Sequence, residues 1–435
     1  MQQSHDSDGT NAEVHDASVK IAGRSRLRLI IGQTFTSLAK QSFRNLWIGF
    51  LLQMGGMQML MLAISYYIYE ITGSASKLGI VVAISAVPVL ALALFGGVIA
   101  DRLEKKRIIQ TGQLISLGVA LFIAFSILTG TITWIHFLVA SFVQGGVLPL
   151  MMPARQAIIP QLVPPDILMN AIALNAMVIS ITTMAAPALA GGLIAIFGIE
   201  SVFFVIALLY AGAIFFTGLL PHIDAPPRRS DSTVLNDIKA GLEYVLWNRA
   251  ILTLILLSFA TMLLAMPIRF VLPIFAKDVF SVGPEGLGYM ISAMGVGALC
   301  GTLVIASLSK LTRRGMILAI SGMISGGVLL AFATMSYLSP LFATAIGFMV
   351  IIGLLQAGRM TISNSLMMEY TDQQYRGRVM SIVTLSMGIM PAGVIPVTLM
   401  VDLVGAPLSI GFMALLLMVV TGVILATSPS IRQLK

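Results

Sequence analysis

A short charged segment interrupts a long apolar stretch near residue 100. FGGVIADRLEKKRII (95–109) follows about eighteen uncharged residues and carries Asp101, Arg102, Glu104, Lys105, Lys106 and Arg107 within seven positions. Lysine and arginine can keep such a bend at a membrane surface, but an acid is not needed for that. A carboxylate can accept hydrogen bonds from the free N–H groups at a helix N-terminus. We therefore expect Asp101 to bind another helix, whereas the basic residues are explained equally well as a topology signal.

Two arginines lie inside apolar runs, Arg269 in MPIRFVLP and Arg359 in LLQAGRMTISN. An arginine that faces lipid there costs about 2.5–3.5 kcal/mol on the translocon scale. We expect each to face a cavity or a partner, where it can pair with an anionic ligand such as a carboxylate or catecholate. The alternative is that the side chain extends toward the membrane interface.

Neutral polar side chains and methionines provide further candidates for a substrate path. The run QMGGMQMLML (53–62) is rich in methionine, which suits irregular apolar ligands but more often serves packing. Hydrogen bonding between helices explains each polar candidate as well as ligand contact does. These candidates are Gln53, Gln58, Gln144, Asn175, Gln356 and Asn364.

Nothing in the sequence indicates catalysis. The four histidines are scattered, the one cysteine, Cys300, lies in an apolar run, and no phosphate-binding loop or metal-ligand spacing is present. The sequence therefore predicts no enzyme, no cofactor and no metal site.

The amino-acid composition indicates the environment in which these side chains lie. Of 435 residues, 57% are hydrophobic and 10% are charged, against about 25% charged in a typical soluble domain. The mean hydropathy is +0.96. The net charge of +8 does not indicate a nucleic-acid partner, because the basic residues lie in short loops between apolar runs. The sequence predicts an all-α integral membrane protein.

Twelve apolar runs are long enough to cross a bilayer as helices of about 20 residues. They divide the chain into five parts: a tail with an amphipathic segment (1–42), a six-helix bundle (43–220), a linker with a surface helix (221–250), a second six-helix bundle (251–427) and a short tail (428–435). The expected spans are 46–69, 78–100, 108–128, 132–152, 171–196, 201–220, 251–275, 287–308, 316–335, 338–362, 379–401 and 406–426.

The distribution of lysine and arginine predicts the orientation. The two tails and the even-numbered gaps between spans, with Arg155 counted at one of them, hold 22 of the 26 basic residues. The odd-numbered gaps hold Lys77 and Lys277 only. Positive charge marks the cytoplasmic side, so we expect a multi-pass protein of the cell membrane with both termini in the cytoplasm.

The two halves resemble each other at an interval of 208 residues. At this interval DRLEKKRII (101–109) aligns with SKLTRRGMI (309–317), and PPDILMNAIAL (164–174) aligns with DQQYRGRVMSI (372–382). Weak internal repeats of this kind are typical of transporters whose site lies between the repeats at mid-membrane.

The charged bend resembles the signature of the major facilitator superfamily between its second and third helices. The matching residues are Gly97, Ala100, Asp101, Arg102, Lys105 and Lys106, whereas Glu104 stands where the family usually has a second glycine. The resemblance implies two six-helix, pseudo-symmetric halves. It also implies that Asp101 contacts the start of the eleventh helix, YRGRV (375–379) with Arg376 and Arg378, as a conformational latch.

Other stretches are similar to the branch that contains enterobactin exporters and macrolide-efflux proteins. These are YEITGSASKLG (69–79), MMPARQAIIPQLVPPDILMNAIALN (151–175) and YRGRVMS (375–381). AAPALAGG (185–192), with Pro187 and Gly191, resembles the fifth-helix motif of exporters, although Ala186 replaces its glycine. Small residues there allow close helix contact, and an ordinary close-packed helix pair is the alternative explanation.

The sequence departs from related drug:proton antiporters at a position that bears on proton coupling. Related drug:proton antiporters carry an arginine three residues before a Gln-Gly pair, and here Ser141 stands three residues before Gln144 and Gly145. No acid lies in the middle of a span, so Glu70 and Asp278 at span ends are the remaining candidate proton carriers.

Together these observations predict a secondary active exporter of hydrophobic or amphipathic small molecules, drugs or siderophores, that works by alternating access. Its partners are the small-molecule substrate, membrane lipid and candidate coupling protons, without nucleic acid or a required ATP-binding subunit. The alternatives are an importer of a small polar solute on the same fold, and a transport-inactive receptor or scaffold.

Overall fold

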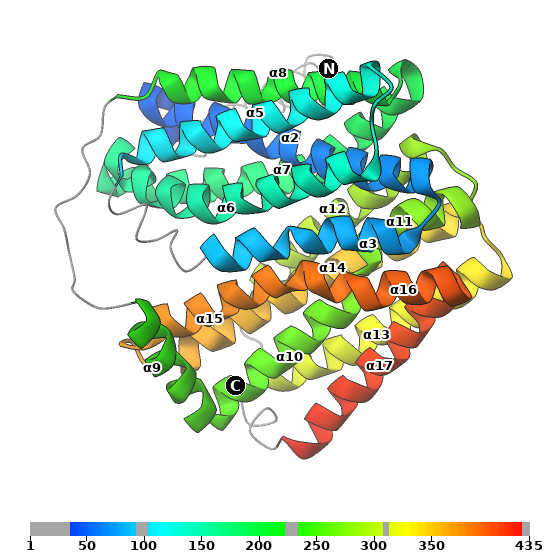
Figure 1. Ribbon diagram of the computed structural model, residues 1–435. Coiled ribbons are helices and arrows are strands. Elements are labelled where there is room, and N and C mark those ends of the chain that lie inside the picture. Colours follow the sequence, from blue (N-terminus) through cyan, green and yellow to red (C-terminus); the bar gives the residue numbers. More distant parts are fainter. Residues whose placement is uncertain (1–34, 93–102, 222–233, 308–312, 429–435) are drawn as a thin grey trace, which may run out of the picture.

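The computed structural model describes residues 35–92, 103–221, 234–307 and 313–428. Every regular element within these ranges is helical. Gly97, Asp101 and Arg102 of the charged bend lie outside the described residues. Figure 1 shows the helices running side by side, with α2, α5 and α8 on one side and α10, α13 and α17 on the other.

The first half contains six long helices. After the short η1 (Thr36–Ala39) they are α2 (Gln41–Thr72), α3 (Ala75–Ile84, with helix continuing to Leu92), α5 (Lys105–Leu128), α6 (Trp134–Leu162), α7 (Leu168–Phe197, preceded by η2, Pro165–Ile167) and α8 (Ile199–Gly218).

The second half repeats this order after α9 (Val234–Trp247), which packs against α15 at one end of the bundle. Its elements are α10 (Arg249–Ala265), α11 (Ile268–Ile274), the π-helical turn η3 (Phe275–Val279), α12 (Pro284–Ser307), α13 (Arg314–Leu338), α14 (Phe342–Tyr370), α15 (Arg376–Ile389), η4 (Met390–Gly393), α16 (Val394–Val404) and α17 (Ala406–Thr427).

The interval of 208 residues reappears in the helix boundaries. The helix α6 (Trp134–Leu162) and its counterpart α14 (Phe342–Tyr370) begin and end at this interval, and the starts of α2 (Gln41) and α10 (Arg249) are separated by it. The sequence repeat therefore corresponds to a structural repeat, and residues 208 positions apart occupy equivalent places in the two halves.

Eleven helices of the described chain are long and apolar enough to cross a membrane. The expected eleventh span is divided into α15, η4 and α16 around Pro391. Proline lacks the N–H that a continuous helix needs. Pro267 divides the seventh span between α10 and α11 for the same reason.

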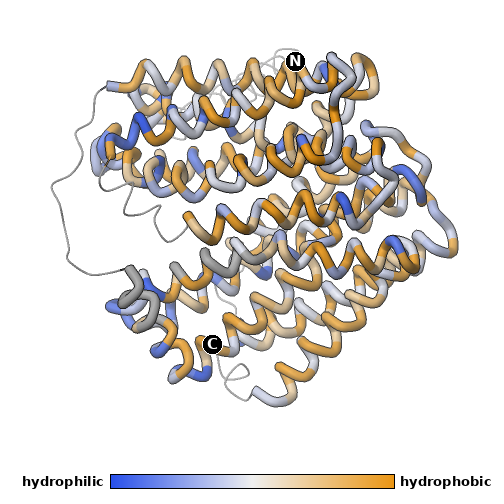
Figure 2. The backbone as a smooth tube through the Cα atoms, viewed as in Figure 1, coloured by the Kyte–Doolittle hydropathy of each residue, from blue (hydrophilic) through white to orange (hydrophobic). Residues whose placement is uncertain are grey.

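Hydrophobic residues predominate along the helices, as the hydropathy colouring of Figure 2 shows. Large apolar side chains with more than half of their surface exposed occur on both halves, for example Met169, Leu208, Leu303 and Leu403. In water such a surface would aggregate, whereas hydrocarbon solvates it and the helices satisfy their own backbone groups. The prediction of an all-α membrane fold is confirmed.

The place of Arg155 corrects the sequence analysis. We counted it with the basic residues of a loop after a span at 132–152, but α6 continues to Leu162 through Pro149, Pro153 and Pro160. Arg155 lies inside this helix and is 1% exposed. Membrane helices tolerate such prolines because neighbouring groups satisfy the freed backbone atoms, so the helix is longer than the minimum span that we expected.

Candidate substrate site and the contact between the halves

A cavity with a volume of about 220 Å³ lies in the second half. Residues of α10, α14, α15 and η4 line it, together with Met266 beside α10, from the middle of these helices toward the end of the bundle that carries α9. The lining is largely apolar, with five methionines. It consists of Ile255, Ser258, Phe259, Thr261, Met262, Met266, Gln356, Arg359, Met360, Ser363, Asn364, Met367, Val383 and Met390.

Three residues expected on the substrate path, Gln356, Arg359 and Asn364, meet in this cavity. They lie on α14 at intervals of three and five residues. Arg359 is 7% exposed, and its Nη1 donates a hydrogen bond to Ser325 Oγ on α13 at 2.7 Å. The Ser325 hydroxyl in turn donates to the carbonyl oxygen of Ser321 at 2.8 Å. This chain of hydrogen bonds holds the guanidinium beside the cavity.

The equivalent region of the first half is filled. Arg155 places its guanidinium carbon 4.3 Å from the centre of the Phe50 ring, and its Nη1 donates to the Leu46 carbonyl oxygen at 3.4 Å. Phe50, Met54 and Val178 form a buried cluster with Trp47 packed against it. The methionines of helix α2 thus serve packing: Met54 and Met59 are buried, and Met61 lines only a very small second cavity.

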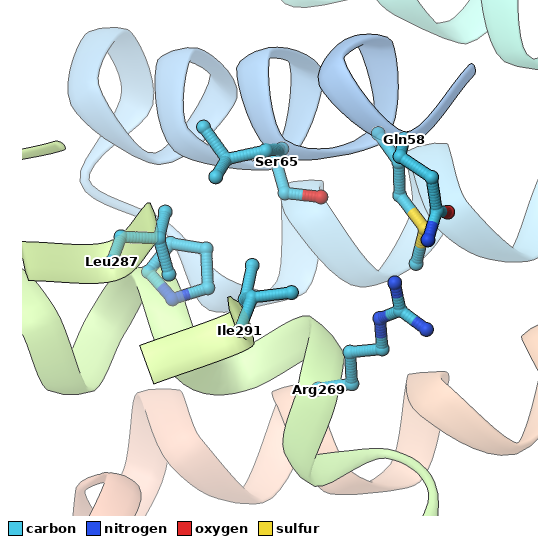
Figure 3. Close-up of a pocket in the computed structure, with 8 residues that line it drawn as sticks. Gln58, Ser65, Arg269, Leu287 and Ile291 are labelled. Carbon is cyan, nitrogen blue, oxygen red and sulfur yellow. The ribbon is translucent and has the colours of Figure 1, made fainter. Parts of the chain in front are cut away.

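Arg269 lies in that second cavity, whose volume is about 10 Å³, about the space that one water molecule needs. Figure 3 shows its guanidinium pointing toward Gln58, with Ser65, Leu287 and Ile291 nearby. Gln58 itself donates to Thr183 Oγ1 on α7 at 2.8 Å. The structure thus places Arg269 and Gln58 together, apart from the larger cavity.

The remaining neutral candidates lie within the first half. Gln144 and Ser116 are joined by hydrogen bonds of 3.2 and 3.3 Å between α6 and α5. Gln53 is buried in α2, and its Oε1 has no hydrogen-bond partner among the described residues. Asn175 lies half-buried on α7. The structure does not bring these three residues into the large cavity.

The two halves approach each other closely along α7 and α12. A Cβ built on Gly191 would lie 2.3 Å from the Pro284 carbonyl oxygen, and one on Gly288 would lie 2.6 Å from the Pro187 carbonyl oxygen. The Ala188 N–H, beside Pro187, donates to Ser292 Oγ on α12 at 3.1 Å. The motif around Pro187 and Gly191 is therefore part of the interface between the halves.

At the end of the bundle where α2 ends and α3 begins, hereafter the α2–α3 end, polar side chains join the halves. Lys277 Nζ lies 2.9 Å from Glu70 Oε2, and the Tyr69 hydroxyl donates to the Asp278 carboxylate. Tyr69 and Lys277 are 208 positions apart, as are Glu70 and Asp278. The two contacts are thus related by the repeat, as in a self-complementary interface.

Asp402 of α16 adds a third contact at this end, with the start of α3. Its carboxylate accepts from the backbone N–H groups of Ala75 at 2.8 Å and Ser76 at 2.9 Å, and from the hydroxyls of Ser74 and Ser76. The first N–H groups of a helix have no partner within it, and the helix dipole favours an anion there. Asp402 of one half thereby caps a helix of the other.

The described residues of the expected latch lie at the opposite end. Lys106 Nζ donates to the carbonyl oxygens of Gly218 at 2.8 Å and Leu220 at 2.5 Å, at the end of α8. Lys105 is buried, and its Nζ has no partner among the described residues. Arg376, the first residue of α15, donates to the Thr371 carbonyl oxygen, and Arg378 lies over the Tyr375 ring.

The sequence analysis did not identify three groups that contact the site or join the halves. They are Ser325 beside Arg359, the Ser258–Ser363 pair at the cavity, and Asp402. Serines in apolar runs are too common to single out. Asp402 carried a usable signal, because it is an acid at the end of a span opposite the free N–H groups of another helix start. No group of three or more His, Cys, Asp or Glu residues in the described chain could hold a metal ion.

Two repeated six-helix halves, a cavity in the second half and a close contact between the halves are the features of a membrane transporter of the major facilitator class. The model of one family, the transmembrane secretion effectors, matches residues 32–433. The chain belongs to this family of the major facilitator superfamily.

Known proteins agree with this assignment. The chain is 25% identical over 382 residues to macrolide efflux protein A of Streptococcus pyogenes, covering 84% of this chain and 91% of the relative. It is 22% identical to the staphyloferrin A transporter of Staphylococcus aureus, covering 79% and 85%. The crystal structure of a POT family transporter with 5-aminolevulinic acid shares the fold, with a TM-score of 0.71 at 14% identity over 89% of this chain and 96% of that one.

Proposed function

We propose that the protein exports hydrophobic or amphipathic small molecules, of the drug or siderophore type, by alternating access of its two halves. The observation that carries the proposal is the 220 Å³ cavity, lined by five methionines and by Gln356, Arg359 and Asn364. Flexible thioethers adapt to irregular apolar shapes, and a few polar groups orient the ligand. The names of the two relatives support cargo of this kind.

The proposed orientation places both termini in the cytoplasm and the α2–α3 end outside, because the basic residues gather at the opposite end. The contacts of Glu70, Asp278 and Asp402 then close the outer side in this conformation. In this proposed orientation the cavity would lie toward the cytoplasmic side, where an exporter collects its cargo.

The latch and the coupling ion are parts of the same proposal. In an outward-open state, Asp101 would accept hydrogen bonds from the start of α15, which begins at Arg376. Protons are the proposed coupling ion, with Glu70 and Asp278 as carriers. Both acids have partners across the interface between the halves, so protonation of either would weaken a contact that closes the outer side.

Accumulation of a compound panel in a pump-deficient bacterial host tests the function. The panel contains lipophilic cations, macrolides and catechol siderophores, and the wild type is compared with Asp101→Asn at matched membrane levels. Asp166→Asn is the matched control, because Asp166 is an exposed acid outside the charged bend. We expect lower accumulation with the wild type and Asp166→Asn than with the empty vector, and loss of the difference in Asp101→Asn.

A protonophore added to the same cells tests the coupling, and it should abolish the difference. Unchanged export after collapse of the proton gradient would rule out protons. Higher accumulation with the wild type would indicate an importer. Equal accumulation of every compound with wild type and vector would contradict the export proposal.

A further inference from the structure

We propose that the cavity takes an amphipathic molecule with one anionic head group, and that Arg359 binds this group. The inference rests on the proposed function in that it treats the cavity as the cargo site. It goes beyond that function by naming the chemical class of the cargo and the residue that selects it.

The first argument is the uncompensated charge. Arg359 is the one charged side chain among the residues that line the cavity, and none of the ion pairs of the described chain includes it. A cation removed from water in apolar surroundings is costly unless an anion is beside it. An anion bound in the cavity beside Arg359 would therefore offset this cost.

The second argument is hydrogen-bonding capacity. A guanidinium has five N–H donors, and the Ser325 hydroxyl accepts from Nη1 only. Among the described residues, some buried polar atoms have neither solvent contact nor a hydrogen-bond partner, and no nitrogen of Arg359 is one of them. The other N–H donors of Arg359 therefore remain accessible from the cavity. Because Ser325 is itself bonded to Ser321, the guanidinium is held in place before a ligand arrives. Such a planar donor set suits a carboxylate, sulfonate or phosphate.

The third argument concerns the rest of the ligand. Phe259 and the five methionines provide an apolar lining beside the polar groups. An engineered cavity of about 150 Å³ holds a benzene molecule, so 220 Å³ accommodates one or two fused rings or the matching part of a larger molecule. The amide groups of Gln356 and Asn364 supply neutral donors in the same lining, which can bind oxygen atoms of the ligand.

Two fluorescent probes that share one ring system test the inference. Dansylate and dansylamide have the same dimethylaminonaphthalene body, but the first carries a sulfonate anion and the second a neutral sulfonamide. Their binding is measured by fluorescence titration of the full-length protein in lipid nanodiscs, with empty nanodiscs subtracted. The proteins are the wild type, Arg359→Gln, Arg359→Lys and, as a control, Arg249→Gln, which removes an exposed cation at the start of α10.

We expect the wild type to bind dansylate about tenfold or more tightly than dansylamide, as a charge-assisted hydrogen bond implies. Arg359→Gln should abolish this preference while keeping the affinity for dansylamide, which also shows that the variant is folded. Arg359→Lys should keep part of the preference, and Arg249→Gln should keep all of it.

Three results would overturn the inference: no preference for dansylate in the wild type, an unchanged preference in Arg359→Gln, or an equal loss of both probes in that variant. Absence of saturable binding by both probes would also exclude this ligand class. Binding at equilibrium does not depend on transport, so these outcomes are separate from failure of the export assay.

Discussion

The two halves of the protein share one scaffold but fill the same region differently. Phe50 and Arg155 pack against each other in the first half, with 4.3 Å from the guanidinium carbon to the ring centre. The residues 208 positions further on are Ser258 and Ser363, whose hydroxyls lie 2.6 Å apart at the wall of the cavity. A ring and a guanidinium are thus replaced by two small hydroxyl groups.

Neighbouring positions strengthen the contrast. Trp47 of the first half corresponds to Ile255 of the second, and the buried Met151 corresponds to Arg359. The arginine of each half therefore lies on the equivalent helix, but one is enclosed by packing and the other borders open space. The difference shows that the role of a membrane-embedded arginine is decided by the size of the side chains around it, since both halves bury the same kind of charge.

Removal of a large buried side chain from the first half should have the largest effect on the free energy of unfolding. Phe50→Ala removes a fully buried ring from a filled cluster, and such changes cost about 3–5 kcal/mol because the cavity only partly collapses. The equivalent Ser258→Ala exchange should cost about 1 kcal/mol, the value of one hydrogen bond. Thermal unfolding of the two purified variants measures the difference. Equal destabilisation would show that the halves are packed alike.

Larger side chains in the cavity of the second half should make it resemble the packed first half. Ile255→Trp combined with Ser258→Phe introduces the side chains of the first half into the cavity. Overpacking of a site by this amount costs about 1–3 kcal/mol, and a ligand that has to overcome this cost loses roughly 5–150-fold in affinity. Probe titration measures the loss, with Leu303→Phe on the lipid-facing side of α12 as a control for added bulk. Undiminished binding would place the ligand elsewhere.

The two halves also differ at the α2–α3 end, where an acid caps one of the two equivalent helix starts and a proline begins the other. The expected effect on stability is smaller than for the exchanges above. The position equivalent to Asp402 is Ile194, and Pro284 at the start of α12 needs no cap for a backbone N–H. Asp402→Asn should therefore weaken the closed α2–α3 end by about 1 kcal/mol, the usual value of a helix cap. Reactivity of a cysteine placed at Lys77, whose backbone N–H donates to Ser74 Oγ rather than to Asp402, should rise severalfold in a Cys300→Ala background. Unchanged reactivity would mean that the other contacts keep this end closed.

The smallest expected effect concerns the equivalent basic residues Lys106 and Arg314. Lys106 binds carbonyl oxygens at the end of α8, whereas Arg314 forms an ion pair with Glu369 at 2.8 Å. Lys106→Met should cost about 0.3–1 kcal/mol, because a cation at a helix C-terminus contributes that much. Arg314→Met should cost no more than an exposed ion pair, about 0–1 kcal/mol. Thermal unfolding at low and high salt tests both, since salt should reduce each effect.

Much of the architecture could be predicted from the sequence, because apolar run length and the 208-residue repeat are direct physical signals. The repeat predicted two equivalent halves, and the helix boundaries follow it closely. The cost of burying charge likewise identified Arg359, which lines the cavity together with Gln356 and Asn364. Asp101, for which the sequence made the most specific prediction, lies outside the described residues and stays a prediction.

Features that depend on contacts distant in sequence could not be predicted in the same way. Arg155 was assigned to a gap because the expected span ended at residue 152, but α6 continues to Leu162 and the Arg155 guanidinium packs on the Phe50 ring. The candidates Gln144 and Gln58 proved to bind partners within the first half, as buried amides commonly do. Which half holds the cavity depends on small differences in side-chain volume, which no periodicity reveals.

The glycine contact along α7 and α12 has a consequence for how the protein can evolve. A side chain at Gly191 or Gly288 would meet backbone of the opposite half within 2.6 Å, so these positions admit almost no other residue. The methionine-rich wall of the cavity tolerates exchange, because flexible apolar side chains can be swapped with little loss of packing. Under the proposed function, selection can therefore alter the range of cargo through the cavity while the contact surfaces between the halves stay fixed. Such a separation allows a single scaffold to diversify by point mutation.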